Sequence, residues 1–155
     1  MILTTHILAG AVIGESTNNL WLIIPAAILG HFALDAIPHS EYIRSFEENF
    51  TLRNTWWKVG LDLLFGLFII TLFILCSDYD LIKIENILIG VLFSILPDFL
   101  NLLYWKFGFK FLEKIHNFHH WVHCSSRNLK NNDWNIRNAK NDIIISIIAL
   151  ILLFA

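Results

Sequence analysis

Histidine and aspartate occur inside apolar stretches of this sequence, in a spacing that suits metal binding. His31 and Asp35 lie four residues apart at the end of one apolar run, so their side chains share one face of a helix. Pro38 then ends the helix and leaves His39 just beyond it. Imidazole and carboxylate groups are ligands that zinc, iron and manganese accept. Because ionisable groups are costly in an apolar segment, this stretch predicts a functional site.

Three other apolar segments carry a residue of the same kind. His6 lies near the start of the first segment, Asp62 lies one turn inside the third, and Asp98 lies near the end of the fourth, directly after Pro97. Three aspartates therefore lie inside apolar segments, and no Lys or Arg lies at that depth. A carboxylate there costs about 3 kcal/mol if it is unpaired. We expect the missing positive charge from protonated histidine, from protons on the aspartates or from a bound cation.

A second group of histidines follows the fourth apolar segment. Its members are His116, His119, His120 and His123. This spacing predicts four imidazoles on one helical face. Basic residues precede them, namely Lys106, Lys110 and Lys114, and aromatic residues are interleaved with both groups. The pattern predicts a basic, aromatic helix at a membrane surface that presents metal ligands. The alternative is a helix that uses His and Trp only as interfacial anchors.

Composition and apolar segments indicate a polytopic membrane protein. The chain is 56% hydrophobic and 15% charged, which is too apolar for an ordinary soluble domain. Its net charge is −2, and no basic run indicates nucleic-acid binding. We expect one all-α domain, residues 1–155, with about five apolar helices and an interfacial His-rich helix. The apolar segments are about 1–14, 20–37, 56–76, 81–105 and 143–155.

The distribution of Lys and Arg predicts an orientation. If all five segments cross a membrane, ten of the eleven basic residues lie on one side, which is then the cytoplasmic side. The N-terminus also lies on that side. The histidines and aspartates come to a similar depth near the same side, and the outer halves of the segments hold nothing comparable. The sequence thus predicts a multi-pass protein of the inner (plasma) membrane with a site on its cytoplasmic face.

These motifs resemble those of the small bacterial inner-membrane metal-dependent hydrolases. The matching residues are Gly30-His31-x-x-x-Asp35, Leu96-Pro97-Asp98, the His116–His123 cluster and Thr5-His6. Two features differ: the Leu-Pro-Asp motif follows the His-containing helix instead of preceding it, and a second Asp after Pro-Asp is missing. The resemblance implies a membrane-bound fold and a metal-dependent hydrolytic activity.

We therefore expect a metal-dependent hydrolase that acts on a phosphoester or lipid-linked substrate, because the site lies at headgroup depth. One or two divalent ions, zinc first and manganese or iron as alternatives, would activate a water molecule. Membrane lipid is the expected partner. The candidate metal ligands are His6, His31, Asp35, His39, Asp98, His119, His120 and His123. The candidates for catalytic proton transfer are Asp62, Asp98 and His116.

Three other functions remain open at this stage. A proton or metal-ion conductor also uses Asp and His chains, but it needs polar groups that continue to the far side. A structural membrane protein could use the same cluster as a metal staple without turnover. A di-iron lipid hydroxylase or desaturase contains a box like His116-x-x-His119-His120, but such enzymes use more histidines than the seven of this chain.

Overall fold

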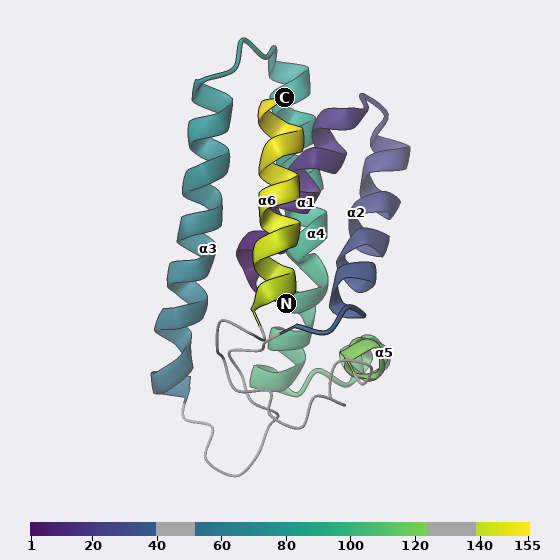
Figure 1. The fold of residues 1–155 in the computed structure, drawn as a ribbon. Coiled ribbons are helices and arrows are strands. Elements are labelled where there is room, and N and C mark those ends of the chain that lie inside the picture. The colour runs from purple at the N-terminus through teal and green to yellow at the C-terminus, as the bar shows by residue number, and fades with distance from the viewer. Residues whose placement is uncertain (40–51, 124–138) are drawn as a thin grey trace.

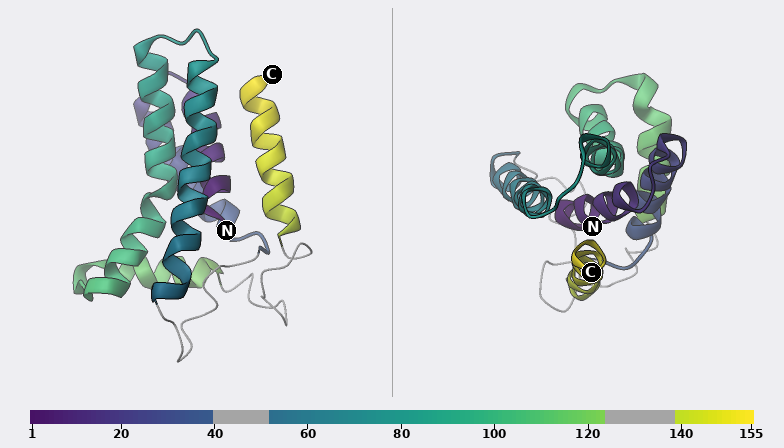
Figure 2. Two further views of the ribbon diagram at one scale, coloured as in Figure 1. Left: turned by 90° about the vertical axis from the view of Figure 1, so that its left-hand side faces the viewer. Right: turned by 90° about the horizontal axis from the view of Figure 1, so that it is seen from above.

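The computed structural model describes residues 1–39, 52–123 and 139–155, and within 52–56 only the backbone. The described part is all-helical and contains no strand, which confirms the predicted all-α class. The helices are α1 (Leu3–Ser16), α2 (Leu20–Asp35), α3 (Leu52–Leu75), α4 (Leu81–Phe107), the short 3₁₀ helix η1 (Lys110–Leu112), α5 (Glu113–His123) and α6 (Lys140–Phe154). The helices α2, α3, α4 and α6 run along the bundle, α1 crosses its middle obliquely, and α5 lies across one end (Figures 1 and 2).

Each predicted apolar segment forms a helix, but only two of the described helices are candidate membrane spans. These are Trp57–Leu75 and Leu81–Phe107, with 19 and 27 residues. The helices α1, α2 and α6 have only 14, 16 and 15 residues. Much of the apolar surface of α3 is exposed, including Leu64 and Phe68. An apolar helix with this much exposed surface is typical of contact with lipid or with a partner.

The short helix α1 is the centre of the bundle. It packs most extensively against α4 and also contacts α2, α3 and α6. Seen from above in Figure 2, α1 passes between α4 and α6. Its side chains Ile7, Leu8 and Ala11 are completely buried. Because its neighbours cover it on several sides, α1 can be both short and apolar without itself facing the surroundings.

Three glycines allow α1 and α4 to pack backbone to backbone. A Cβ atom at Gly10 would lie 2.5 Å from the carbonyl oxygen of Gly90, and a Cβ atom at Gly14 would overlap the backbone of α4 at Asn86. Glycines four residues apart are typical of such close helix crossings. The short separation lets the Ser94 hydroxyl on α4 donate a 2.8 Å hydrogen bond to the carbonyl oxygen of His6 on α1.

The chain turns sharply between α4 and α5. Gly108 adopts a left-handed conformation with φ of 66°, and its N–H donates to the carbonyl oxygen of Tyr104 at 2.8 Å. This is a glycine cap, which ends a helix because few other residues adopt that conformation at low cost. The basic, aromatic stretch predicted as one helix is therefore divided between α4, η1 and α5. The turn sends α5 across the end of the bundle (Figure 2).

Candidate metal centre

Helix α2 carries His31 and Asp35 into the interior. Its buried residues are spaced four apart, Ile23, Ala27, His31 and Asp35, and form one stripe along the helix. The stripe is apolar in the middle of the bundle and polar at the end where α5 crosses. Both His31 and Asp35 are completely buried. The same face that packs the core therefore delivers an imidazole and a carboxylate to one end of it.

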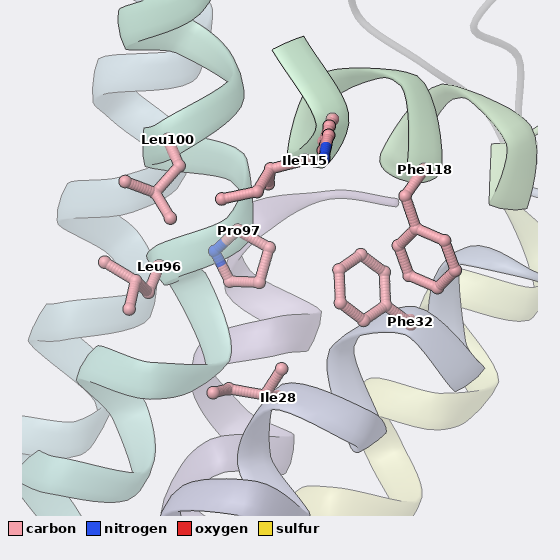
Figure 3. Close-up of a pocket in the computed structure, with 8 residues that line it drawn as sticks. Ile28, Phe32, Leu96, Pro97, Leu100, Ile115 and Phe118 are labelled. Carbon is pink, nitrogen blue, oxygen red and sulfur yellow. The ribbon is translucent and has the colours of Figure 1, made fainter. Parts of the chain in front are cut away.

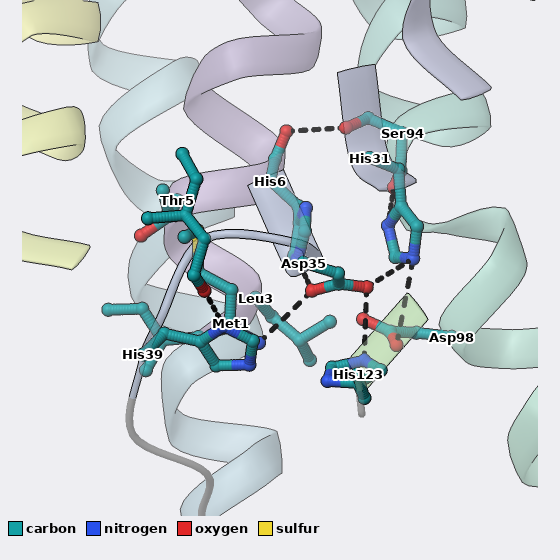
Figure 4. Close-up of polar contacts among 12 residues, drawn as sticks. Met1, Leu3, Thr5, His6, His31, Asp35, His39, Ser94, Asp98 and His123 are labelled. Atoms are coloured by element: carbon teal, nitrogen blue, oxygen red, sulfur yellow. Dashed lines mark hydrogen bonds and ion pairs between the residues drawn. The ribbon is translucent and has the colours of Figure 1, made fainter. Parts of the chain in front are cut away.

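Oxygen Oδ2 of Asp35 is the point where three imidazoles meet. It lies 2.9 Å from Nε2 of His31, 3.3 Å from Nε2 of His119 and 3.1 Å from Nε2 of His123. Three Nε2 atoms around one carboxylate oxygen form a dense group of potential metal ligands. In Figure 4, His31 and His123 approach the Asp35 carboxylate from different sides.

The other carboxylate oxygen of Asp35 faces α1. Oδ1 lies 3.2 Å from Nε2 of His6 and 3.2 Å from the amino group of Met1. The His6 ring also stacks on that of His31, with 4.3 Å between their centres. His6 thus contacts the cluster through Asp35 and His31, at the side away from α5 (Figure 4).

The residues His31, Asp35, Asp98 and His119 could hold one metal ion, because their ligand atoms lie within 4.8 Å of one another. Nε2 of His119 lies 3.2 Å from Nε2 of His31 and 3.2 Å from Oδ1 of Asp98, and Nε2 of His31 lies 4.0 Å from the same Oδ1. A tetrahedral ion with bonds of about 2.0–2.1 Å separates its ligands by about 3.3–3.4 Å. The measured distances, from 2.9 to 4.0 Å, lie on both sides of that value.

A backbone carbonyl orients the His31 ring. Nδ1 of His31 lies 2.7 Å from the carbonyl oxygen of Ser94, so this nitrogen donates its hydrogen. The neutral ring then presents a lone pair at Nε2, the atom that faces Asp35 and His119. Metal-bound histidines are held in the same way by an acceptor behind the ring.

A second group, formed by Asp35, His39 and His123, could also hold an ion. Nδ1 of His39 donates to the carbonyl oxygen of Ile37 at 2.7 Å, which again leaves Nε2 as the potential ligand. Burial, followed by the nearby N-terminal ammonium, lowers the pKa of His39 to about 4. The ring is therefore neutral at pH 7, the form that binds metals. Asp35 belongs to both groups and therefore connects them.

His119 supplies positive charge when no metal is bound. Burial disfavours the charged ring, but hydrogen bonds to Asp35 and Asp98 outweigh burial and raise the pKa of His119 to about 9. At neutral pH the ring thus carries a proton between two carboxylates. A divalent cation could take the place of that proton, because both provide positive charge at the same point.

Asp62 lies outside both groups and caps α1. Its carboxylate accepts hydrogen bonds from the N–H of Leu3 at 2.6 Å, from the N–H of Thr4 at 3.3 Å and from the Thr4 hydroxyl at 2.5 Å. Free N–H groups at the start of a helix need acceptors, and a carboxylate there is stabilised by the helix dipole. The backbone N–H groups of α1 therefore provide the positive charge that Asp62 needs, and Asp62 does not require a bound cation.

His116 and His120 also lie outside both groups. The His116 ring stacks on Tyr104, with 4.3 Å between centres, and its Nδ1 lies 2.6 Å from Oδ1 of Asn101. The His120 ring lies 6.1 Å from that of His116. At about 100° per residue, these two histidines are rotated about 60° around the helix from His119 and His123. The predicted single face of four imidazoles is thus divided into two pairs.

Two residues at this end were not identified from sequence. Asp142, at the start of α6, is completely buried, and its Oδ1 accepts from the N–H of Ile2 at 3.2 Å. Its only signal in the sequence is its position just before an apolar run. Ser94 positions His31 and His6 through its carbonyl and hydroxyl oxygens, and nothing in the sequence distinguishes it from other serines.

Comparisons of the chain with protein-family models, with curated proteins and with solved structures find no match. The resemblance to membrane-bound hydrolases therefore rests on the sequence motifs alone. What bears on function is the geometry of the two groups of potential ligands around Asp35.

Proposed function

We propose that the chain is a membrane-embedded, metal-dependent hydrolase whose ion lies among His31, Asp35, Asp98 and His119. The observation that carries the proposal is the separation of the four ligand atoms, which suits a tetrahedral ion. Zinc is the ion that most often has this geometry with imidazole and carboxylate ligands. The buried Asp35 and the hydrogen bond behind His31 support the same conclusion.

Asp98 marks the side on which water reaches the ion. Its side chain is 28% exposed, whereas those of His31, Asp35 and His119 are at most 5% exposed. The Oδ1 atom of Asp98 lies 4.0 Å from Nε2 of His31, farther than the 3.2 Å that separates it from Nε2 of His119. Catalytic zinc sites keep one position for water, and the bound water has a pKa near 7. In the hydrolase, Asp98 accepts the proton of the attacking water and leaves the fourth position open, whereas Asp98 as a fourth ligand would close the site.

The location of the cluster supports a substrate at a membrane surface. It lies at the end of two candidate membrane-spanning helices, where α5 crosses the bundle (Figure 1). The proposed orientation has this end at the cytoplasmic face of the inner membrane, with α1, α2 and α6 completing a bundle of five membrane-embedded helices, and the distribution of Lys and Arg supports it. Phosphoesters and lipid-linked phosphates are among the electrophiles at that depth.

A metal staple without turnover is the second candidate. Three of the four ligands are almost completely buried, as in structural sites. An ion there would connect α2, α4 and α5. Such an ion would stabilise the bundle and would not need an open position for water.

Metal analysis and hydrolysis assays on the purified protein separate the two functions. We expect at least one ion per chain in the wild type, hydrolysis of one member of a phosphoester panel, and loss of turnover in Asp98→Ala. His116→Gln, on α5 but outside both groups, is the matched control and should keep metal and turnover. Bound metal without turnover on any ester would support the staple. Absence of bound zinc, manganese and iron after reconstitution would refute both functions.

A further inference from the structure

An apolar groove lies beside the metal centre, between α2, α4 and α5. Its volume is about 370 Å³, and its lining is apolar except for Lys114. Figure 3 shows Ile28 and Phe32 on one wall, Leu96, Pro97 and Leu100 on another, and Ile115 and Phe118 on α5. A volume of this size accommodates part of a hydrocarbon chain, and the lining offers a headgroup only one charged partner.

The groove and the metal centre share a wall. The ring of Phe32 packs edge-on against those of His31 and Phe118, with 5.1 and 4.9 Å between centres, and its centre lies 6.0 Å from that of His119. On α4, the lining residue Pro97 directly precedes Asp98. One aromatic layer therefore separates a chain in the groove from the imidazoles of the cluster.

Lys114 gives this groove a preference for negative charge. Its side chain is exposed at the groove, and no described carboxylate forms an ion pair with it. Large aromatic side chains of η1 and α5 are also exposed, with Phe111 76% and Trp121 67% accessible. Exposed aromatic and basic residues on one short helix are typical of a helix that lies at the headgroup level of a membrane. The groove beneath α5 is then at the depth of the acyl chains.

We propose that this groove binds one acyl chain of an anionic phospholipid, with the phosphate held near Lys114 and beside the metal centre. The assignment of that lipid as substrate rests on the proposed hydrolase, whereas its binding does not. The occupant follows from the apolar lining, from the one positive charge among the described residues that line the groove, and from its position under α5. A soluble phosphate would use Lys114 but would leave the apolar walls empty.

The test uses metal-free protein in phosphatidylcholine nanodiscs that contain a trace of phosphatidylglycerol with a photoreactive acyl chain. We expect crosslinks at residues 28–32, 96–100 and 115–118. Ile28→Trp, which fills the groove, should lower these crosslinks about tenfold, whereas Leu29→Trp, on the exposed side of α2, should not. Lys114→Glu should lower the crosslinks of phosphatidylglycerol more than those of a phosphatidylcholine probe, because only the first lipid has a net negative charge, and Lys110→Glu should change neither.

Crosslinks spread evenly over the exposed faces of α3 and α6, with no loss in Ile28→Trp, would overturn the proposal that the groove binds the acyl chain. Loss of crosslinks on addition of glycerol 3-phosphate would show that the phosphate alone is recognised, and would also overturn it. Because the protein is metal-free, absence of hydrolytic activity does not affect this result. Conversely, turnover of a soluble ester that is unaffected by Ile28→Trp, together with unchanged crosslinks, would leave the hydrolase intact and refute the groove.

Discussion

Replacing Gly10 with alanine tests whether the close contact of α1 with α4 positions the metal centre. The new Cβ atom would lie 2.5 Å from the carbonyl oxygen of Gly90 and 2.7 Å from Cβ of Ser94. Ordinary contacts are at least 3.4 Å, so the two helices must separate by about 0.7–0.9 Å at this point. Both obstacles lie on or next to backbone and cannot rotate away. Overpacking of this kind costs about 1–3 kcal/mol.

The same displacement reaches the ligands through Ser94. The carbonyl oxygen of Ser94 accepts the 2.7 Å hydrogen bond from Nδ1 of His31, and the Ser94 hydroxyl donates to the carbonyl oxygen of His6. A movement of about 0.8 Å stretches the first bond beyond normal length. Loss of the acceptor behind a ligating histidine lowers metal affinity about 10- to 100-fold. We therefore expect Gly10→Ala to be less stable and also to bind metal more weakly.

Gly60→Ala is the matched control, because a Cβ atom at Gly60 in α3 meets no atom within 4 Å. This change should be neutral or should stabilise by up to about 1 kcal/mol, since alanine favours the helix. Thermal unfolding in detergent with EDTA, followed by tryptophan fluorescence, measures stability, and competition with a fluorescent chelator measures zinc affinity. If Gly10→Ala equals Gly60→Ala in both measurements, the close contact does not position the ligands and the reasoning is wrong.

Three further predictions address individual residues. Because the pKa of His119 is raised to about 9, a metal ion must displace the proton of His119 at pH 7. The apparent zinc affinity should therefore rise about tenfold per pH unit from pH 7 and level off above pH 9. An equal affinity at pH 7 and 9 in chelator competition would contradict this. Asp62→Asn should lower stability in EDTA by about 1–2 kcal/mol, since it weakens the cap of α1, and should leave zinc affinity unchanged. His119→Gln should abolish high-affinity zinc binding in equilibrium dialysis while His116→Gln retains it, and equal losses in both would show that the division into two pairs is incorrect.

The positions of the helices could be predicted because hydropathy and polar turns are local signals. The apolar segments and the turn at residues 17–19 are visible directly in the sequence. The burial of α1 could not be predicted, since an apolar helix has the same composition whether lipid or protein covers it. The turn at Gly108 was missed for a related reason. A single glycine ends a helix only when the following chain packs elsewhere, and that packing is tertiary.

The cluster of histidine and aspartate shows the same division between local and tertiary signals. The spacing of His31 and Asp35 is sufficient to place both on the buried face of α2. Which histidines of α5 join them depends on the rotation of that helix about its own axis. A rotation of about 60° decides between His119 and His116, and the chain after Gly108 sets it. Spacing alone therefore predicts the ligand types and the helix, but not the individual imidazoles.

The three aspartates expected to need positive charge obtain it in different ways. Asp62 accepts hydrogen bonds from backbone N–H groups at the start of α1, and every helix has such groups, so no partner residue could reveal this pairing in the sequence. Asp35 and Asp98 instead share the imidazole of His119, and Asp35 also faces the amino group of Met1. A helix N-terminus is a fixed partial charge, whereas a protonated imidazole can release its proton to make room for a metal ion. The carboxylates beside His119 can thus exchange a proton for a cation, whereas the cap at Asp62 cannot, and this difference locates the exchangeable charge where α2, α4 and α5 meet.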